Sequence, residues 1–268
     1  MQFVFLGCGD GHGVPRVGCR CQVCHNALAP DSRNGRTGPS AALRGGPSYA
    51  DRVVLIDAPL EFRLQAVRLG LDHFDALLLT HAHDAHILGL SALVQAQREA
   101  GLPLPIYAPA QVLDQVRERF NHFWTDKVYR RVVQPRPIEQ GVDLWGLEVR
   151  ALRLDHGLGG TAYGYLFSFG RGRLAYISDM LRPTAEVRQA LTGLDLLVLG
   201  TSHYYEEIDL WKRSVMDIVA ALDLIRQVAP RQALLTHLSH TVDYEAISAR
   251  LPPGIGLAYD GLSVEVEE

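Results

Sequence analysis

The sequence predicts a layered fold of strands and helices in one domain, with polar side chains gathered at one edge. Short apolar runs alternate along the chain with segments of helical periodicity, which is the pattern of an α/β or α+β fold. Several of these runs end directly in a histidine or an aspartate. No internal repeat, low-complexity linker or break in composition divides the 268 residues, so we expect a single domain over 1–268.

The first half of the chain alternates strands and helices after a long N-terminal loop. The predicted strands are aliphatic or β-branched runs, and the predicted helices place apolar residues three or four positions apart. A polar, glycine-rich segment from about 7 to about 46 is predicted to be a loop. In chain order, the elements are strands at Gln2–Leu6 and Val53–Ile56, a helix at Leu60–Leu71, a strand at Ala76–Thr80, a helix at Asp84–Ala100, a strand at Pro105–Ala108 and a helix at Ala110–Phe120.

The second half continues the alternation on the same criteria. It begins with strands at Leu147–Leu154, Ala162–Phe169 and Leu174–Ser178, followed by a helix at Thr184–Leu191 and a strand at Leu196–Leu199. The remaining elements are a helix at Ser214–Val228, a strand at Ala233–Thr236, a helix at Asp243–Leu251, and strands at Gly256–Tyr259 and Leu262–Val266.

The composition excludes several classes of protein. Hydrophobic residues make up 47% of the chain and charged residues 21%, which is typical of a folded globular protein and not of a disordered one. The formal net charge of −4 provides no basic field, so binding to nucleic acid or to an anionic membrane is not expected. No apolar run approaches the roughly 20 residues that span a bilayer, and the N-terminus lacks the basic region of a signal peptide. We therefore expect a cytoplasmic protein.

Three of the four cysteines lie close together in the N-terminal loop. Cys19, Cys21 and Cys24 have the spacing C-x-C-x-x-C, and clustered cysteines in a cytoplasmic chain indicate a metal site before a disulfide. Cys19 and Cys21 are also too close in sequence for an easy bridge, because disulfide geometry is strict. Cys8 lies outside this spacing and is expected to be a small core residue.

Histidines and aspartates occur at or just after the ends of predicted strands, where layered α/β proteins form their ligand sites. Seven of the eleven histidines lie at or beside such points, whereas histidines that serve only as polar surface residues would be scattered. The residues at or beside these points are Asp57, His81, His83, His86, His156, Asp179, His203, His237 and His240.

The segment HAHDAH at 81–86 is the strongest local signal. In extended backbone, His81 and His83 point to the same side and suit two ligands on one ion. His86 falls in the first turn of the next helix, from which it can face a neighbouring position. The competing interpretation is a polar helix start with Asp84 as its cap. Because neutral imidazole is the commonest metal ligand, we interpret the three histidines as ligands.

In these residues the chain resembles the metallo-β-lactamase-fold hydrolases, whose hallmark is THxHxDH after a strand. The matching positions are Thr80–His86, Asp57 in LIDAP, His156 in LDHG, Asp179 in YISD and His237 in LLTHLSH. The resemblance covers essentially the whole chain and implies an α+β fold of four layers, an αβ/βα sandwich with two metal ions at its rim. The implied ligands are His81, His83, His156 and Asp179 for one ion, and His86, Asp179 and His237 for the other.

One position departs from that family pattern. Where the family has an aspartate directly before the last histidine of the block, this chain has Ala85, and the acidic residue stands one position earlier as Asp84. On a helix this is a rotation of about 100°, so Asp84 does not simply replace the missing ligand. We expect one or two catalytic divalent ions, with the second site weakened. Asp57 and Asp84 are expected to orient ligands and not to bind the ions themselves.

Further segments are similar to one branch of the family, the phosphodiesterase that acts on 5-phosphoribosyl 1,2-cyclic phosphate in the carbon–phosphorus lyase pathway. These segments are GVPRVGCRCQVC, LIDAP, THAHDAHILGL, GTSH, LLTHLSH and AYDG. The resemblance implies that His203, in GTSH, is the general acid. It also implies a structural zinc ion, for which three thiolates and one imidazole close a tetrahedral site. The implied zinc ligands are Cys19, Cys21, Cys24 and His240.

The expected reaction is hydrolysis of a small, cyclic phosphodiester by a metal-dependent enzyme. A metal-bound hydroxide attacks phosphorus, with zinc and manganese as candidate ions. His203 protonates the leaving oxygen, because an alkoxide leaves poorly without a proton, and Asp179 anchors the ions. Guanidinium groups suit the substrate phosphate, and Arg16, Arg33 and Arg36 are candidates. The expected partner is a small-molecule substrate, and a homodimer is common in the family that the chain resembles.

Three alternatives stay open at this point. Loops on a shared fold decide the substrate, so the chain also fits another hydrolase of this fold, such as a nuclease, a lactonase or a thioesterase. The absence of a basic excess argues against RNA processing. A second alternative is a cofactor-biosynthesis protein similar to the B protein of the pyrroloquinoline quinone pathway. The third is a metal-binding scaffold whose second site decayed at Ala85, against which the retained histidines argue.

Overall fold

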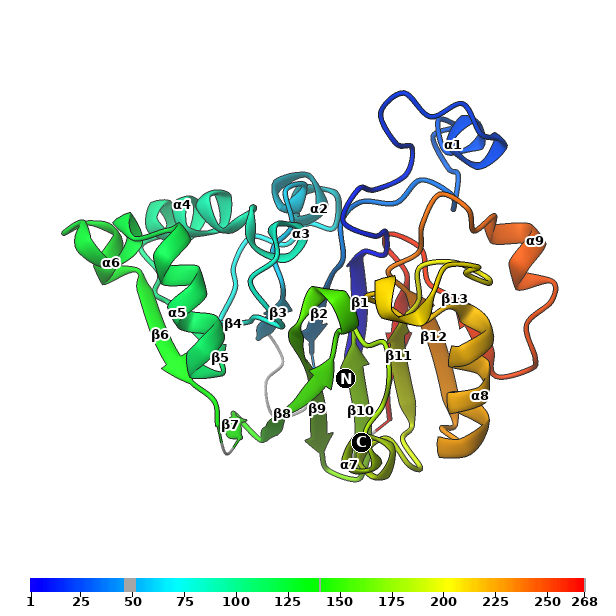
Figure 1. The fold of residues 1–268 in the computed structure, drawn as a ribbon. Coiled ribbons are helices and arrows are strands. Elements are labelled where there is room, and N and C mark those ends of the chain that lie inside the picture. The colour runs from blue at the N-terminus through cyan, green and yellow to red at the C-terminus, as the bar shows by residue number, and fades with distance from the viewer. Residues whose placement is uncertain (46–51, 140, 268) are drawn as a thin grey trace.

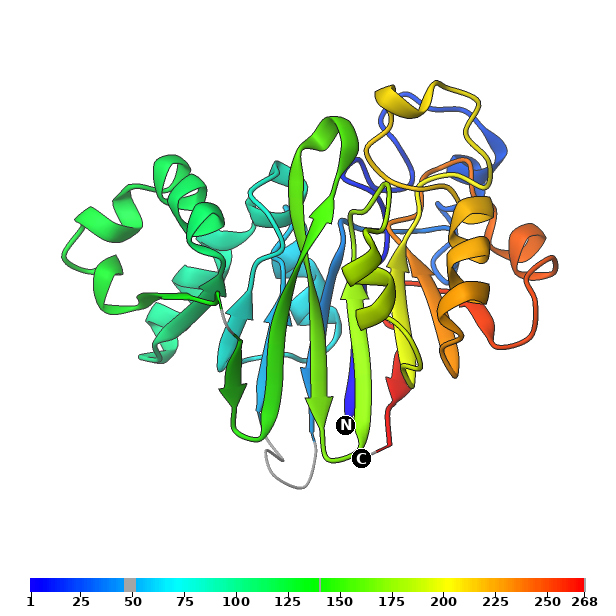
Figure 2. The same cartoon turned by 60° about the horizontal axis from the view of Figure 1, so that its bottom comes forward.

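A computed structural model of the chain shows two sheets packed face to face, with helices on their outer faces (Figures 1 and 2). The structure describes residues 1–45, 52–139 and 141–267. This is the four-layer αβ/βα sandwich that the sequence resemblance implies. None of the helices in these ranges has the length and apolar character needed to cross a membrane.

The first sheet contains seven strands in the spatial order β14-β1-β2-β3-β4-β5-β6. Their bounds are β1 (Gln2–Gly7), β2 (Ser40–Arg44), β3 (Val53–Ile56), β4 (Ala76–Leu78), β5 (Leu104–Ala108), β6 (Val133–Pro137) and β14 (Ser263–Glu265). Strands β3, β4, β5 and β6 are parallel to their neighbours in that run. Their carboxyl ends therefore lie at the same edge of the sheet.

The second sheet also has seven strands, in the order β13-β12-β11-β10-β9-β8-β7. Their bounds are β7 (Val142–Leu144), β8 (Leu147–Asp155), β9 (Thr161–Phe169), β10 (Gly172–Ile177), β11 (Leu196–Gly200), β12 (Gln232–Thr236) and β13 (Ile255–Leu257). The run from β10 to β13 is parallel. Every residue of β11 is buried, as expected of a parallel strand that is covered on both faces.

The helices cover the outer faces of the two sheets. On the first sheet these are α2 (Phe62–Arg68), α3 (Asp84–Ile87), α4 (Leu90–Ala100) and α5 (Ala110–Arg119), and on the second α7 (Ala185–Ala190), α8 (Ile218–Val228) and α9 (Tyr244–Ser248). The remaining turns of helix are α1 (Gln22–Asn26), α6 (His122–Thr125), η1 (Tyr129–Arg131), η2 (Gly157–Gly159) and η3 (Leu210–Lys212). In Figure 1 both chain termini lie at the opposite end of the strands from α1.

Alternation of side chains along the strands builds the separate layers of the core. In β1, Phe3 and Phe5 point between the sheets, whereas Leu6 packs with the helices of the outer face. From the second sheet, Tyr176 meets Phe3 with ring centroids 6.0 Å apart. This period of two is the physical reason that each sheet can bury both of its faces.

Two predicted elements differ from the structure. The helix expected at Asp84–Ala100 is interrupted between α3 and α4, because the carbonyl of His86 accepts the amide of Ala58 at 2.8 Å and the Gly89 amide donates to Ala58 at 2.8 Å. These contacts replace the hydrogen bonds of a continuous helix. The loop expected at about 7–46 contains β2, whose small residues gave no strand signal. The end of that loop, at 46, lies outside the described residues.

Candidate metal centre

The carboxyl ends of the parallel strands bring the candidate ligands together at one edge of the sandwich. Two of the residues there, Asp57 and His237, have φ angles of 58° and 59°, in a region that residues other than glycine rarely adopt. The residues at this edge are Asp57 after β3, His81 after β4, His83 before α3, His86 within α3, His156 after β8, Asp179 after β10 and His237 after β12. We call this group the rim cluster.

Three imidazole nitrogens of the rim cluster converge on one point. His83 Nδ1 lies 2.9 Å from His81 Nε2 and 3.3 Å from His156 Nε2. The other nitrogen of His156 donates to the carbonyl of Ser214 at 2.8 Å, so its Nε2 carries a lone pair. Likewise, His81 Nδ1 is 2.9 Å from the hydroxyl of Thr80. The ligand atoms of the three histidines lie within 4.8 Å of one another, which suits a shared metal ion.

A second group forms around the carboxylate of Asp179. His86 Nε2 lies 3.3 Å from its Oδ2, and His237 Nε2 lies 3.3 Å from its Oδ1. His81, His86 and Asp179 form a further set of ligand atoms within 4.8 Å of one another. Oδ2 of Asp179 is buried and makes no hydrogen bond among the described residues. Because an unpaired buried carboxylate oxygen is costly, a cation fits this position.

The surroundings favour the metal-binding form of His81, His83 and Asp179. Burial lowers the pKa of His81 well below its usual value, and neighbouring histidines add to this effect. Burial also lowers the pKa of His83. For Asp179, burial opposes ionisation, but His237, His86 and other histidines outweigh it and lower its pKa well below the usual range. In His86, Asp57 and Asp179 outweigh burial and raise the pKa.

Asp57 and Thr80 orient two of the ligands from behind. Asp57 Oδ2 accepts a hydrogen bond from His86 Nδ1 at 2.7 Å and another from the Thr80 hydroxyl at 2.8 Å. The Thr80 amide donates to the other carboxylate oxygen at 2.9 Å. Asp57 therefore turns the Nε2 of His86 toward Asp179 and, through Thr80, the Nε2 of His81 toward His83. Sequence reasoning predicted this place for Asp57 but assigned no role to Thr80, although Thr80 directly precedes His81.

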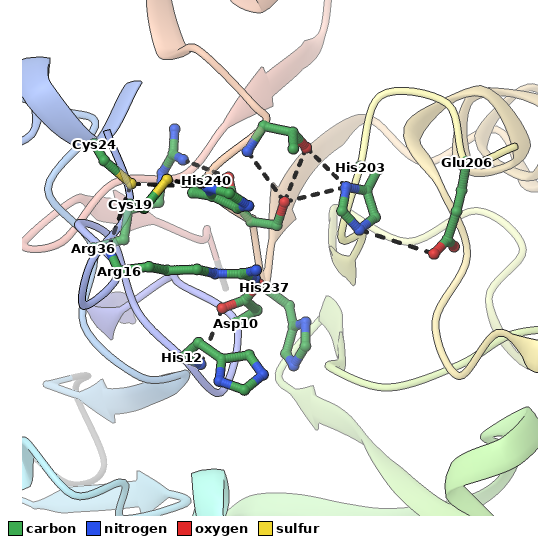
Figure 3. Close-up of polar contacts among 12 residues, drawn as sticks. Asp10, His12, Arg16, Cys19, Cys24, Arg36, His203, Glu206, His237 and His240 are labelled. Carbon is green, nitrogen blue, oxygen red and sulfur yellow. Dashed lines mark hydrogen bonds and ion pairs between the residues drawn. The ribbon is translucent and has the colours of Figure 1, made fainter. Parts of the chain in front are cut away.

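The cysteine knuckle, Cys19, Cys21 and Cys24 with His240, forms a separate site. Figure 3 shows Cys19, Cys24 and His240 of this group. His240 Nδ1 lies 3.2, 3.6 and 3.8 Å from the sulfurs of Cys19, Cys21 and Cys24 respectively. Backbone amides of Arg16 and Cys24 donate to the sulfurs of Cys24 and Cys21, each at 3.4 Å. Three thiolates and one imidazole, which leave no coordination position open, suit a structural zinc ion.

The thiols of the knuckle have opposite tendencies to ionise. The amide of Cys24 lowers the pKa of Cys21, whereas burial raises the pKa of Cys24 to about 11. The knuckle therefore needs a cation to hold both sulfurs as thiolates. Cys8 is buried in the core, as predicted, and its thiol donates to Asp260 at 3.3 Å.

His203 lies beyond β11, beside the turn that carries His240 (Figure 3). Its Nδ1 is 2.8 Å from the Thr241 hydroxyl and 3.2 Å from the Ser239 hydroxyl. Its Nε2 lies 3.9 Å from Oε1 of Glu206, and 29% of its side chain is exposed. One nitrogen is thus held by hydroxyl groups, while the other faces a carboxylate in a position that solvent and substrate can reach.

A family model described as "Beta-lactamase superfamily domain" matches residues 52–238. The chain belongs to this superfamily. The match includes every residue of the rim cluster and ends before His240, so the cysteine knuckle lies outside it. The fold and family implied by the sequence resemblance are thereby confirmed.

Two relatives that are similar in sequence have names that describe different functions. An octanoyltransferase of Porphyromonas gingivalis is 32% identical over 276 residues, which cover 100% of this chain but 52% of that protein, so the chain spans about half the length of this relative. A coenzyme PQQ synthesis protein B of a Methylobacterium species is 27% identical over 316 residues, covering 98% of this chain and 99% of the relative.

Among solved structures, a diphosphatase from the PhnP family superposes with a TM-score of 0.85 at 29% identity, covering 99% of this chain and 98% of that one. The Zn(2+)-bound PqqB from Methylobacterium extorquens superposes with a TM-score of 0.80 at 23% identity, covering 99% and 100% of the two chains. The second likeness shows a shared fold.

Ala85, where the chain departs from the superfamily pattern, lies against the N-terminal loop. The N-terminal loop comes so close that a Cβ atom at Gly11 would lie 2.8 Å from Cβ of Ala85. Asp84 differs from expectation: it forms an ion pair with Arg119, and 65% of its side chain is exposed. The rotation along the helix turns this carboxylate to solvent, so it contacts Arg119 in place of a ligand.

The candidate phosphate-binding arginines are engaged in other contacts. Arg36 is buried and donates to the carbonyls of Ser239 and Val242 at 3.1 and 2.8 Å. Arg33 lies over the rings of two tyrosines, and Arg16 forms an ion pair with Asp10. Arg36 therefore serves the packing of the N-terminal loop, which corrects the expectation that it meets a substrate.

Proposed function

We propose that this superfamily member is a metal-dependent phosphodiesterase that hydrolyses a small cyclic phosphate such as 5-phosphoribosyl 1,2-cyclic phosphate. The observation that carries the proposal is the buried Asp179 carboxylate, whose Oδ2 lacks a hydrogen-bond donor among the described residues while histidine nitrogens surround it. Such a site holds divalent cations, and divalent cations neutralise phosphoryl oxygens.

The residues divide into two adjoining ion positions. His81, His83 and His156, with Asp179, would hold one ion, and His86, Asp179 and His237 would hold a second, weaker one because Ala85 supplies no oxygen. Zinc and manganese both suit these donors. When bound, the ions activate water as a nucleophile and act as Lewis acids on the phosphoryl group. The knuckle would hold a zinc ion with a structural role.

His203 would serve as the proton donor to the leaving oxygen. Its Nε2 lies 3.9 Å from Oε1 of Glu206, and 29% of its side chain is exposed, which leaves this nitrogen within reach of a substrate. An alkoxide leaving group needs a proton as the P–O bond breaks, and an imidazole near neutral pH delivers it efficiently. Asp57 and Thr80 keep their two histidines turned toward the reacting centre, which requires no movement when substrate binds.

The composition of the chain favours a small substrate over a nucleic acid. A net charge of −4 gives no basic track for a nucleic acid, so a small phosphodiester is the better fit. A diphosphatase from the PhnP family at 29% identity supports a reaction at phosphorus for this chain as well.

The test uses full-length protein purified without chelator. We expect turnover of bis-p-nitrophenyl phosphate and of 5-phosphoribosyl 1,2-cyclic phosphate that rises when manganese is added, with the cyclic phosphate the better substrate in kcat/KM. The matched control is Asp179→Asn, which keeps the shape of the side chain and is expected to show background rates. Activity on lactones or thioesters with none on either phosphodiester would contradict the proposal.

A second candidate is a role in cofactor biosynthesis like that of the coenzyme PQQ synthesis protein B. It is favoured by a relative that is 27% identical across 98% of this chain. Complementation of a bacterial strain lacking that protein separates the two candidates. Restored cofactor synthesis by a chain without phosphodiesterase activity would favour this second role.

A further inference from the structure

The turn that carries His240 also touches His203. Ser239 and Thr241 flank the knuckle histidine, and both present their hydroxyl groups to His203 Nδ1, at 3.2 and 2.8 Å. Figure 3 shows these contacts between the knuckle and His203. Two sites with separate chemistry thus share one short segment of chain.

The turn is anchored on several sides. Arg36, which is buried, donates to the carbonyls of Ser239 and Val242 and so clamps both ends of the segment. The Ser239 amide donates to the carbonyl of Ser202, the residue before His203, at 2.9 Å. These contacts fix the distance between the hydroxyl groups and the imidazole.

One hydrogen bond along the turn has a fixed direction. The Thr241 amide can only donate, and it donates to Ser239 Oγ at 3.2 Å. Ser239 is fully buried, and its own proton has two acceptors within reach, Thr241 Oγ1 at 2.9 Å and His203 Nδ1. With Ser239 Oγ donating to Thr241 Oγ1, the Thr241 hydroxyl is free to donate to His203 Nδ1. Hydrogen bonds aligned in this way strengthen one another.

A neutral imidazole that accepts at Nδ1 carries its proton at Nε2. This is the nitrogen of His203 that faces Glu206, whose other carboxylate oxygen lies 3.7 Å from Nε of Arg213. The hydroxyl pair and the carboxylate therefore act on opposite nitrogens of the same ring.

We propose that Ser239 and Thr241 are positioning residues that fix the ring orientation and the tautomer of His203, and that the cysteine knuckle anchors them. The knuckle thereby contributes to proton donation as well as to the fold of the N-terminal loop. The kinetic consequence rests on the proposed function of His203, whereas the tautomer does not.

The first test is nuclear magnetic resonance of the zinc-loaded, histidine-15N-labelled chain at a pH where His203 is neutral, with His203→Gln to assign its signals. We expect the Nε2–H tautomer in the native chain and in Thr241→Ser, and a mixture of tautomers in Thr241→Val. Thr241 is exposed, so neither substitution is expected to unfold the chain. An Nδ1–H tautomer in the native chain, or no change in Thr241→Val, would overturn the proposal.

The second test compares leaving groups in the metal-loaded enzyme. Thr241→Val should lower kcat for a substrate with an alkoxide leaving group by about 10-fold, a part of the 10²–10⁴ that a complete proton donor contributes. Thr241→Val should change kcat for bis-p-nitrophenyl phosphate little. Thr241→Ser should show the native ratio of the kcat values for the two substrates. Equal losses for both substrates would contradict a positioning role, whereas absence of turnover in the native chain would refute the proposed function and leave the tautomer test intact.

The third test concerns the anchor. Cys24→Ser, which weakens the knuckle, should shift the His203 nitrogen signals in the direction seen for Thr241→Val. Unchanged signals in a folded Cys24→Ser chain would overturn the part assigned to the knuckle.

Discussion

The cysteine knuckle and the rim cluster are both groups of candidate metal ligands, yet they are held in different ways. Three of the knuckle ligands come from one short segment, and they contact mainly one another and backbone amides. The rim ligands come from the ends of strands in both sheets, and other side chains or carbonyls orient several of them.

The two sites also differ in how readily their candidate ligands lose a proton. Burial raises the pKa of Cys24 to about 11, so this thiol gives up its proton only when a cation binds. Burial lowers the pKa of His81 well below its usual value, so this imidazole is already neutral. At these two positions, burial favours the metal-binding form of His81 and opposes that of Cys24.

Removal of the proton donor should produce the largest kinetic effect without touching either ion. His203→Ala is expected to slow turnover of a substrate with an alkoxide leaving group by about 10²–10⁴-fold, because His203 is the group that we propose as proton donor. Steady-state rates on bis-p-nitrophenyl phosphate, whose leaving group needs no proton, are the control and should fall far less. Equal losses on both substrates would remove His203 from this role.

Loss of an orienting group should weaken the rim alone. Asp57→Asn is expected to lower the affinity for the rim ions by about 10–100-fold, the usual cost of losing a partner of a ligand. Asp84→Asn is the matched control, because Asp84 is exposed and paired with Arg119, and it should leave the affinity unchanged. Metal titration by calorimetry measures both. Equal effects of the two variants would argue against preparation of the rim by Asp57.

Lowering the pH should release the ion at the second position of the rim cluster before the ion at the first. Asp57 and Asp179 raise the pKa of His86, so protons compete with the second ion once the pH falls below that value, whereas His81 stays neutral to lower pH. The affinity for the second ion should fall by about tenfold per pH unit for one competing proton. Metal content after dialysis at stepwise lower pH checks the order of release. Simultaneous release of both ions would contradict it.

A carboxylate introduced at position 85, where the family has an aspartate, should give the smallest of the expected effects. Ala85→Asp is expected to tighten the second ion by no more than about 10-fold, because the loop at Gly11 packs against Ala85 and limits the space for the side chain. Competition with a chelator measures the change, and Ala85→Asn controls for size. Unchanged affinity in Ala85→Asp would count against the assignment of the second position.

The sequence predicted those features that depend on neighbouring residues. The strand at Val53–Ile56 matches β3, and the local HAHDAH block contains three of the ligands that the structure brings together. The break before α4 escaped prediction because it depends on Ala58, which comes from another segment. The contact of Ser214 with His156 escaped it too, since 58 residues separate them.

The most direct measurement is metal content per chain by elemental analysis, compared among the native chain, Cys24→Ser and Asp179→Asn. The account predicts that Cys24→Ser loses one zinc ion and keeps the rim ions, while Asp179→Asn loses the rim ions, keeps the zinc of the knuckle and falls to background phosphodiesterase activity. If both variants lost the same ions, or if Asp179→Asn retained its full metal content and activity, the division into a structural knuckle and a catalytic rim would be contradicted.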